Sequence, residues 1–177
     1  MEKSIEQIAT RENLIIIMLE VKRRMGAISE ILQKYGVYFS NKNLSEMVGK
    51  VMEKTASEYF TKKMGYHVKN ALTDKEPDLF FTDIQLPLEI KVTSTTTAWT
   101  GGEFSKRPFN YLMVSWGGQF NEFFVCAVKL NKKDWKSNMS NNYYGPSLSI
   151  KKLGSLKDKI ILVGNIDEKG RMVREKL

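Results

Sequence analysis

Three charged residues in the middle of the chain have the types and spacing that suit phosphodiester hydrolysis. Asp78 is followed after ten residues by Glu89, and Lys91 stands two positions further on. Carboxylate oxygens are the natural ligands of Mg²⁺, which keeps several waters and takes phosphate oxygens into its open positions. A lysine beside that metal can position or activate an attacking water and offset charge that builds on the phosphate. This chemistry requires the two carboxylates to lie close together.

The neighbouring residues predict a hairpin that brings them together. In residues 86–93, apolar side chains alternate with others, which indicates a strand with one buried face. Glu89 and Lys91 therefore project side by side from the opposite face. The apolar run 79–81 predicts the preceding strand, and a turn between the two would fold it back as a hairpin. Asp78 would then lie next to Glu89.

These residues carry a resemblance to a known family. Pro77-Asp78, ten residues, and then Glu89-Ile90-Lys91 resemble the motif of the PD-(D/E)xK nucleases, which include most type II restriction endonucleases. The resemblance implies that Asp78 and Glu89 hold Mg²⁺, that the Ile90 carbonyl adds a ligand, and that Lys91 assists the water. The alternative is a surface strand with a solvated Glu89–Lys91 pair worth well under about 1 kcal/mol.

The segment before the motif adds a further candidate. Residues 43–64 predict a helix whose apolar face packs against the sheet, followed by a short strand at 66–68. Many members of the family have a glycine and then a glutamate on this helix, and Gly49 and Glu53 fit that pattern. The resemblance implies that Glu53 reaches the metal directly or through water. Equally, Glu53 can be an ordinary surface residue paired with Lys50 or Lys54.

The N-terminal segment predicts a long helix over residues 4–35. Its apolar residues have helical spacing, and residues 14–19 are apolar almost all round. Such a helix is either enclosed in the core or shared with a second subunit, so it is the candidate dimer contact. Gly26 is expected to break or bend the helix, and Gly36 to cap its end in a left-handed conformation.

The second half of the chain predicts further strands at 109–116, 120–130, 147–153 and 159–166, the first two forming the centre of the sheet. A charged tail follows at 167–177. No linker composition divides the chain, so residues 1–177 are expected to form a single nuclease domain. The expected class is α/β (α+β). The resemblance implies a restriction-endonuclease-like mixed β-sheet flanked by helices.

Two polar segments, 92–108 and 131–146, are candidate DNA-binding loops. Hydroxyls, backbone N–H groups and basic side chains suit phosphate contacts, and paired glycines allow close backbone approach. Asn side chains can read adenine edges, and aromatic rings can stack on bases. Plain surface loops are the alternative. The predicted contacts are Thr93, Ser94, Thr95, Thr96, Trp99, Ser105, Lys106, Arg107, Lys132, Lys133, Asn141, Asn142 and Tyr143.

The overall composition limits the partners. With 28 Lys and Arg against 20 Asp and Glu, the formal net charge is +8, which favours nucleic acid first and an anionic membrane second, or serves solubility alone. A single cysteine excludes an internal disulfide, and a single histidine argues against zinc. No apolar run approaches a membrane span and no secretory signal is visible. We therefore expect a cytoplasmic protein without a membrane partner.

These observations and the resemblance together predict a function. We expect a Mg²⁺-dependent type II restriction endonuclease that acts as a homodimer on a short, palindromic site in double-stranded DNA and leaves 5′-phosphates. Alternatives are a Holliday-junction resolvase or repair nuclease with the same catalytic residues, and a basic DNA-binding module without catalysis.

Overall fold

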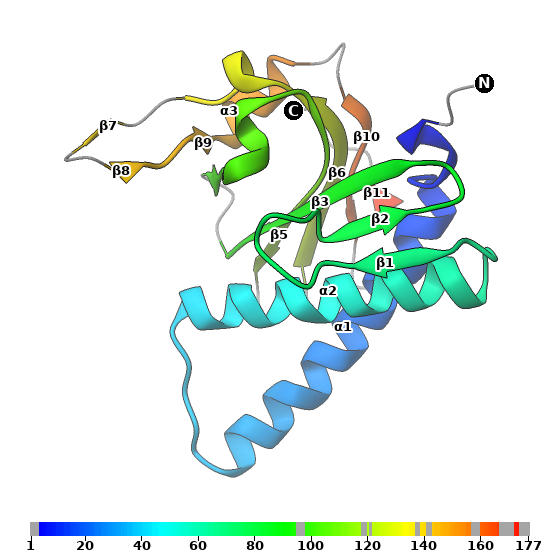
Figure 1. Ribbon diagram of the computed structural model, residues 1–177. Helices are drawn as coiled ribbons and strands as arrows, with labels where there is room; N and C mark the ends of the chain where they lie inside the picture. Colours follow the sequence, from blue (N-terminus) through cyan, green and yellow to red (C-terminus); the bar gives the residue numbers. More distant parts are fainter. Residues whose placement is uncertain are drawn as a thin grey trace.

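A computed structural model describes residues 4–94, 98–117, 120, 122–136, 139–140, 143–156, 160–166 and 172–173. In these residues the chain forms a seven-stranded sheet in the order β1-β2-β3-β5-β6-β10-β11 (Figure 1). Its strands are β1 (Val68–Asn70), β2 (Leu79–Phe81), β3 (Leu86–Thr93), β5 (Phe109–Gly117), β6 (Glu122–Leu130), β10 (Ile160–Ile166) and β11 (Met172–Val173). The mixed sheet with flanking helices confirms the predicted α+β class at this coarse level.

The order of the strands places the motif in the sheet. β3 runs parallel to β5, while the other neighbouring pairs are antiparallel. The predicted hairpin is confirmed, because β2 pairs with β3 and Leu79 lies opposite Leu88. β5 and β6 form the buried centre of the sheet, as their apolar runs predicted.

Two long helices cover one face of the sheet. α1 (Arg11–Lys34) follows a short 3₁₀ turn, η1 (Ile5–Gln7), and α2 (Asn41–Lys62) crosses the sheet beside it (Figure 1). The prediction that Gly26 breaks α1 is wrong. The helix continues through Gly26 because glycine weakens a helix by only about 0.5–1 kcal/mol, and a Cβ at this position would meet no atom within 4 Å. Gly36 has φ +64°, which confirms the predicted left-handed cap.

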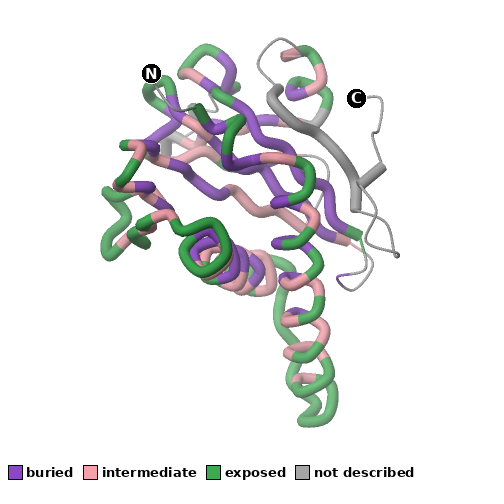
Figure 2. Tube along the Cα trace, turned by 90° about the vertical axis from the view of Figure 1, so that its right-hand side faces the viewer, coloured by how far each residue is buried: buried purple, intermediate pink, exposed green. Residues whose placement is uncertain are grey.

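The main hydrophobic core lies between these helices and the sheet. Buried apolar residues of α1 and α2, such as Met18, Met52 and Phe60, pack against Phe81, Val114 and others on the sheet. The far end of α1 extends away from this core, and its last residues, Gln33 and Lys34, are exposed (Figure 2). None of the described helices is long and apolar enough to cross a membrane.

The opposite face carries a second, smaller core. Around it lie β4 (Trp99–Thr100) paired with β9 (Ser147–Leu148), η2 (Glu103–Lys106), η4 (Lys132–Asp134) and α3 (Ile150–Gly154). β7 (Met139–Ser140) and β8 (Tyr143–Tyr144) form a separate pair that projects from the body (Figure 1).

Three predicted strands are longer than the observed ones. The predicted strand 120–130 begins only at Glu122, and Phe120 instead lies in a 3₁₀ turn with φ +69°. The predicted strand 147–153 is wrong beyond Leu148, because the Ser149 side chain accepts a hydrogen bond from Lys152 N and caps α3. The predicted strand 66–68 begins only at Val68. Tyr66 N still donates to Phe60 O and closes α2, and His67 N donates to the carboxylate of Asp83.

Candidate active site

The β2–β3 hairpin brings Asp78 and Glu89 together as predicted. Asp78 immediately precedes β2, and its Oδ2 accepts a hydrogen bond from Ile90 N at 2.7 Å. Ile90 follows Glu89 in β3, so the bond fixes the Asp78 carboxylate beside the Glu89 backbone. Asp78 and Glu89 also line the same cavity, so the two carboxylates are neighbours.

Glu89 and Lys91 lie side by side on the same face of β3. Lys91 Nζ donates to Glu89 Oε1 at 2.7 Å, and only 8% of the Glu89 side chain is exposed. The predicted alternative, a solvated surface pair, is therefore wrong. Glu89 Oε2 is buried and has no hydrogen-bond partner. A buried acceptor left unsatisfied costs about 1–3 kcal/mol, more when it is charged, so an additional ligand at this oxygen would stabilise the site.

Glu53 approaches the same place from α2. Its carboxylate accepts two hydrogen bonds from Lys50 Nζ, at 2.9 and 2.8 Å, as the surface alternative expected. Glu53 is nevertheless largely buried, with 16% of its side chain exposed. Gly49, one turn earlier, lies near β3, where a Cβ would make an ordinary van der Waals contact with Val92 at 3.8 Å. Glu53 thus pairs with Lys50 and also lines a cavity shared with Asp78 and Lys91.

The pKa values of Asp78, Glu89 and Glu53 are all raised. Burial is the largest cause that raises the pKa of Asp78, and the Ile90 N–H, Lys91 and Lys50 partly offset it. Burial also raises the pKa of Glu89 and of Glu53, and the charge of Asp78 raises both further. Perturbed acids of this kind gather at functional sites because binding a cation or proton relieves them.

Two adjoining cavities open onto these groups. One of about 450 Å³ is lined by Asp78, Glu89 and Lys91 together with the loop 71–76 and the start of η2. The other, of about 1030 Å³, runs between α2 and the end of β3 and is lined by Glu53, Asp78, Lys91 and Thr93 among others. Because they share residues, the cavities form one groove with the acids at its middle.

The donor set fits a magnesium ion. Among the described residues no three acidic, histidine or cysteine side chains group closely enough to hold a metal by themselves. Mg²⁺ needs fewer protein ligands, since it usually binds one or two carboxylates and keeps waters. Asp78 and the unsatisfied Glu89 Oε2 supply those carboxylate oxygens, and Ile90, the predicted carbonyl ligand, lines the larger cavity.

The structure adds two groups that the sequence reasoning missed. Tyr111 of β5 lies opposite Glu89 in the parallel pairing, and its buried hydroxyl has no hydrogen-bond partner. Burial and the charge of Glu89 raise the pKa of Tyr111, so the hydroxyl stays protonated and can donate. Lys50 lines both cavities, and its charge acts on Asp78. Only the strand register could have indicated Tyr111. Helical spacing could have indicated Lys50, because it lies on the same face of α2 as Glu53.

The predicted DNA contacts of the first loop divide into two groups. Thr93 and Ser94 line the larger cavity, and Lys106 and Arg107 are exposed. The predictions for Trp99 and Ser105 are wrong, because both are buried. Trp99 Nε1 donates to Val114 O at 2.8 Å, and Ser105 Oγ donates to Gly102 O at 2.6 Å.

The paired glycines serve packing within the protein. A Cβ at Gly101 would stand 2.8 Å from Pro146, and one at Gly102 would stand 3.6 Å from Lys91 Nζ. Gly101 therefore allows the loop to pack against Pro146, whereas a Cβ at Gly102 would make only an ordinary contact with Lys91. Close approach of the Gly101-Gly102 backbone to DNA stays a prediction.

The second predicted loop is described in part. Lys132 and Lys133 are exposed in η4. Thr95, Thr96, Asn141, Asn142 and the side chain of Tyr143 lie outside the described residues.

Comparisons with known proteins do not extend this picture. No protein-family model matches the chain, and no curated protein sequence matches it.

Proposed function

We propose that the chain is a Mg²⁺-dependent DNA endonuclease with a restriction-endonuclease-like fold. The single observation that carries the proposal is the buried Glu89 Oε2, which has no partner although Glu89 Oε1 binds Lys91 and Asp78 lies alongside. A structural ion pair would satisfy both oxygens. An incomplete set of carboxylate oxygens at the floor of an open groove instead suits a metal that must also reach a substrate.

The residues have complementary roles in this reaction. A bound Mg²⁺ would supply Lewis acidity and lower the pKa of a coordinated water. Asp78 and Glu89 would hold it, with the Ile90 carbonyl as a further ligand. Lys91, whose Nζ lies 2.7 Å from Glu89 Oε1, would orient the attacking water and offset negative charge on the phosphate. Glu53 and Lys50 border the groove and adjust its charge.

The substrate class follows from charge and shape. The net charge of +8 favours a polyanion, and Lys106, the last residue of η2, and Arg107, which follows it, are exposed next to a segment that lines the groove. Arg107 is held in place, since its guanidinium lies over the rings of Phe104 and Phe109 at 5.4 and 5.5 Å. We propose cleavage of double-stranded DNA at a short site, with 5′-phosphate products.

We also propose that two copies act together, one on each strand. The end of α1 and the connection to α2 form a tip surface of exposed apolar residues: Ile31, Tyr35, Val37, Tyr38 and Phe39. Tyr38 is 88% exposed and Tyr35 72% exposed, although tyrosine usually buries most of its ring. A second copy packing on this surface extends the predicted helix contact and provides the two-fold symmetry of a palindromic site.

The self-association has a direct test. Sedimentation of the wild type should show a dimer, and the double variant Ile31→Glu/Tyr38→Glu should sediment as a monomer. Met64→Glu, which changes an exposed apolar residue at the other end of α2, should remain dimeric. A wild type that stays monomeric at micromolar concentration would contradict this part of the proposal.

The activity is tested by digesting unmethylated plasmid and phage DNA with Mg²⁺ or with EDTA. Wild type should produce discrete fragments only with Mg²⁺, and Lys91→Ala should lose at least about 100-fold in rate. Lys62→Gln, an exposed lysine at the end of α2, is the matched control and should cut normally. Cleavage of branched DNA alone would favour a junction resolvase or repair nuclease, and metal-independent binding without cleavage would favour a DNA-binding module.

A further inference from the structure

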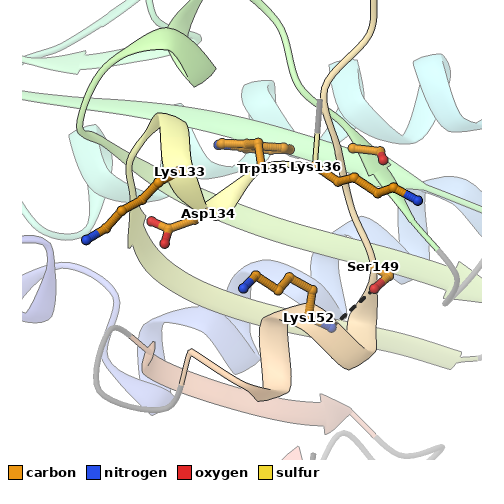
Figure 3. Close-up of a pocket in the computed structure, with 7 residues that line it drawn as sticks. Lys133, Asp134, Trp135, Lys136, Ser149 and Lys152 are labelled. Atoms are coloured by element: carbon orange, nitrogen blue, oxygen red, sulfur yellow. Dashed lines mark hydrogen bonds between the residues drawn. The ribbon is translucent and has the colours of Figure 1, made fainter. Parts of the chain in front are cut away.

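A third cavity, of about 500 Å³, lies on the same face of the sheet as Glu89 and Lys91. It is formed by η4 and the residues after it on one side and by the β9–α3 segment on the other (Figure 3). Its volume is in the range of small-molecule sites. The lining includes Lys133, Asp134, Trp135, Lys136, Ser149 and Lys152.

The lining is positively charged. Within the part of the chain that the structure describes, the ammonium groups of Lys133, Lys136 and Lys152 form no ion pair. The acid among these groups, Asp134, is buried and engaged, because its Oδ2 accepts a hydrogen bond from Asn131 N at 2.8 Å. Three unpaired cations around one opening attract an anion.

A buried donor in the wall of the cavity also lacks an acceptor. Trp135 is 5% exposed, and its indole Nε1 has no hydrogen-bond partner. The ring is held edge-on against Tyr111, with 5.4 Å between ring centroids. Figure 3 shows Lys152 extending below Trp135, with Lys133 and Lys136 toward the two ends of the pocket. A bound anion with an oxygen that reached the indole N–H would also meet the ammonium groups.

We propose that this cavity binds a phosphate group. Phosphate offers several charged acceptor oxygens, which match one fixed indole donor and several mobile ammonium donors better than a single carboxylate does. The phosphate has two possible sources: an internal phosphate of bound DNA, away from the cut, or the phosphate of a free nucleotide. The proposal does not depend on the nuclease activity, because it uses none of the metal-site residues.

Calorimetric titration of the full chain at low salt, with EDTA present, tests the site. The probes are inorganic phosphate, deoxyadenosine 5′-monophosphate, and the dinucleoside monophosphate TpT, whose phosphate is internal. Deoxyadenosine without phosphate is the ligand control. Wild type should bind the phosphate probes saturably. Lys152→Gln and Trp135→Phe, which keeps the ring but removes the N–H, should each weaken binding about tenfold. Lys62→Gln should bind like wild type.

The affinities of the three phosphate probes distinguish the two sources of the phosphate. If TpT binds at least as tightly as the mononucleotide, DNA is the source of the phosphate. If only inorganic phosphate and the mononucleotide bind, the site takes a free nucleotide. Equal affinity of Lys152→Gln and wild type for every probe overturns the proposal, and so does the absence of saturable binding. Because Lys152 is exposed, its variant should fold, which thermal unfolding checks.

Discussion

Replacing Glu89 by glutamine should abolish the stabilisation of the protein by Mg²⁺. Glutamine keeps the shape of the side chain but removes the charge of the Oε2 atom that we assign to the metal. Wild type at a Mg²⁺ concentration of 100 times the Kd gains about 2.7 kcal/mol in the free energy of unfolding. For a chain of this length each kcal/mol raises Tm by about 2–4 °C, so the expected rise is about 5–11 °C.

The metal-free variant should unfold at nearly the same temperature as metal-free wild type. The substitution removes a buried carboxylate whose pKa is raised by burial, which is stabilising, but it also replaces the 2.7 Å ion pair of Glu89 with Lys91 by a weaker neutral acceptor. These effects oppose each other, so we expect Tm in EDTA to change by less than about 4 °C. The Mg²⁺-dependent rise is the decisive quantity.

Thermal unfolding followed by circular dichroism, with and without Mg²⁺, measures both quantities. The matched control is Glu103→Gln at the rim of the same cavity, where Glu103 is exposed and pairs with Lys106. This control should keep the full Mg²⁺-dependent rise. If Glu89→Gln keeps it as well, Glu89 does not hold the metal and the assignment of the site fails. If wild type shows no rise at millimolar Mg²⁺, the site has no useful affinity for the ion.

Three further predictions concern pH, a missed residue and stability. Burial raises the pKa of Asp78 and Glu89 in the folded state. Without metal, the contribution of these two groups to the free energy of unfolding should therefore fall as pH rises from about 4 through their raised pKa values. Comparison of wild type with Glu89→Gln between pH 4 and 8 should show a Tm difference that shifts in favour of the variant; a constant difference would contradict the assigned shift. Tyr111→Phe should lower the rate of DNA cleavage by about tenfold while Tm changes by less than about 4 °C, since it removes a partnerless hydroxyl beside Glu89; an unchanged rate would exclude a role for that hydroxyl. Asn13→Ala should lower the free energy of unfolding by about 2 kcal/mol, or Tm by about 4–8 °C, because the amide donates to Ile8 O at 2.9 Å and accepts from the Tyr59 hydroxyl at 2.8 Å; urea unfolding without a shift would show that water replaces it.

The sequence predicted the elements whose signal is local. The period-two alternation of 86–93 gave β3 its observed bounds, and the apolar run after Asp78 gave β2, so the meeting of Asp78 and Glu89 followed from a hairpin. Gly36 was equally clear, since a left-handed cap is a property of one residue. In these cases the pattern and the tertiary contacts favour the same conformation.

The errors arose where distant contacts decide. Trp99 and Ser105 stand in a hydroxyl-rich, glycine-containing segment that is typical of a surface loop. Trp99 nevertheless lies in β4, which pairs with β9 from far along the chain, and both side chains are buried. Ser149 begins a helix within a segment that alternates like a strand, because one side-chain cap outweighs a weak pattern. Tyr111 was missed for the same reason, as its relation to Glu89 depends on a parallel register between β3 and β5.

Burial of the acids links the stability of this fold to its proposed chemistry. A carboxylate with raised pKa and an unsatisfied oxygen lowers the free energy of unfolding of the metal-free protein. Under the proposed function the same arrangement would favour a divalent cation, because Mg²⁺ would satisfy Oε2 and neutralise the repulsion between Asp78 and Glu89 that Lys91 alone offsets only in part. A more stable site, with each oxygen already bonded to a protein donor, would have no open position for the ion. The strain at Glu89 is therefore what a metal-dependent nuclease site requires, and a variant that relieves it should gain stability only by losing the metal.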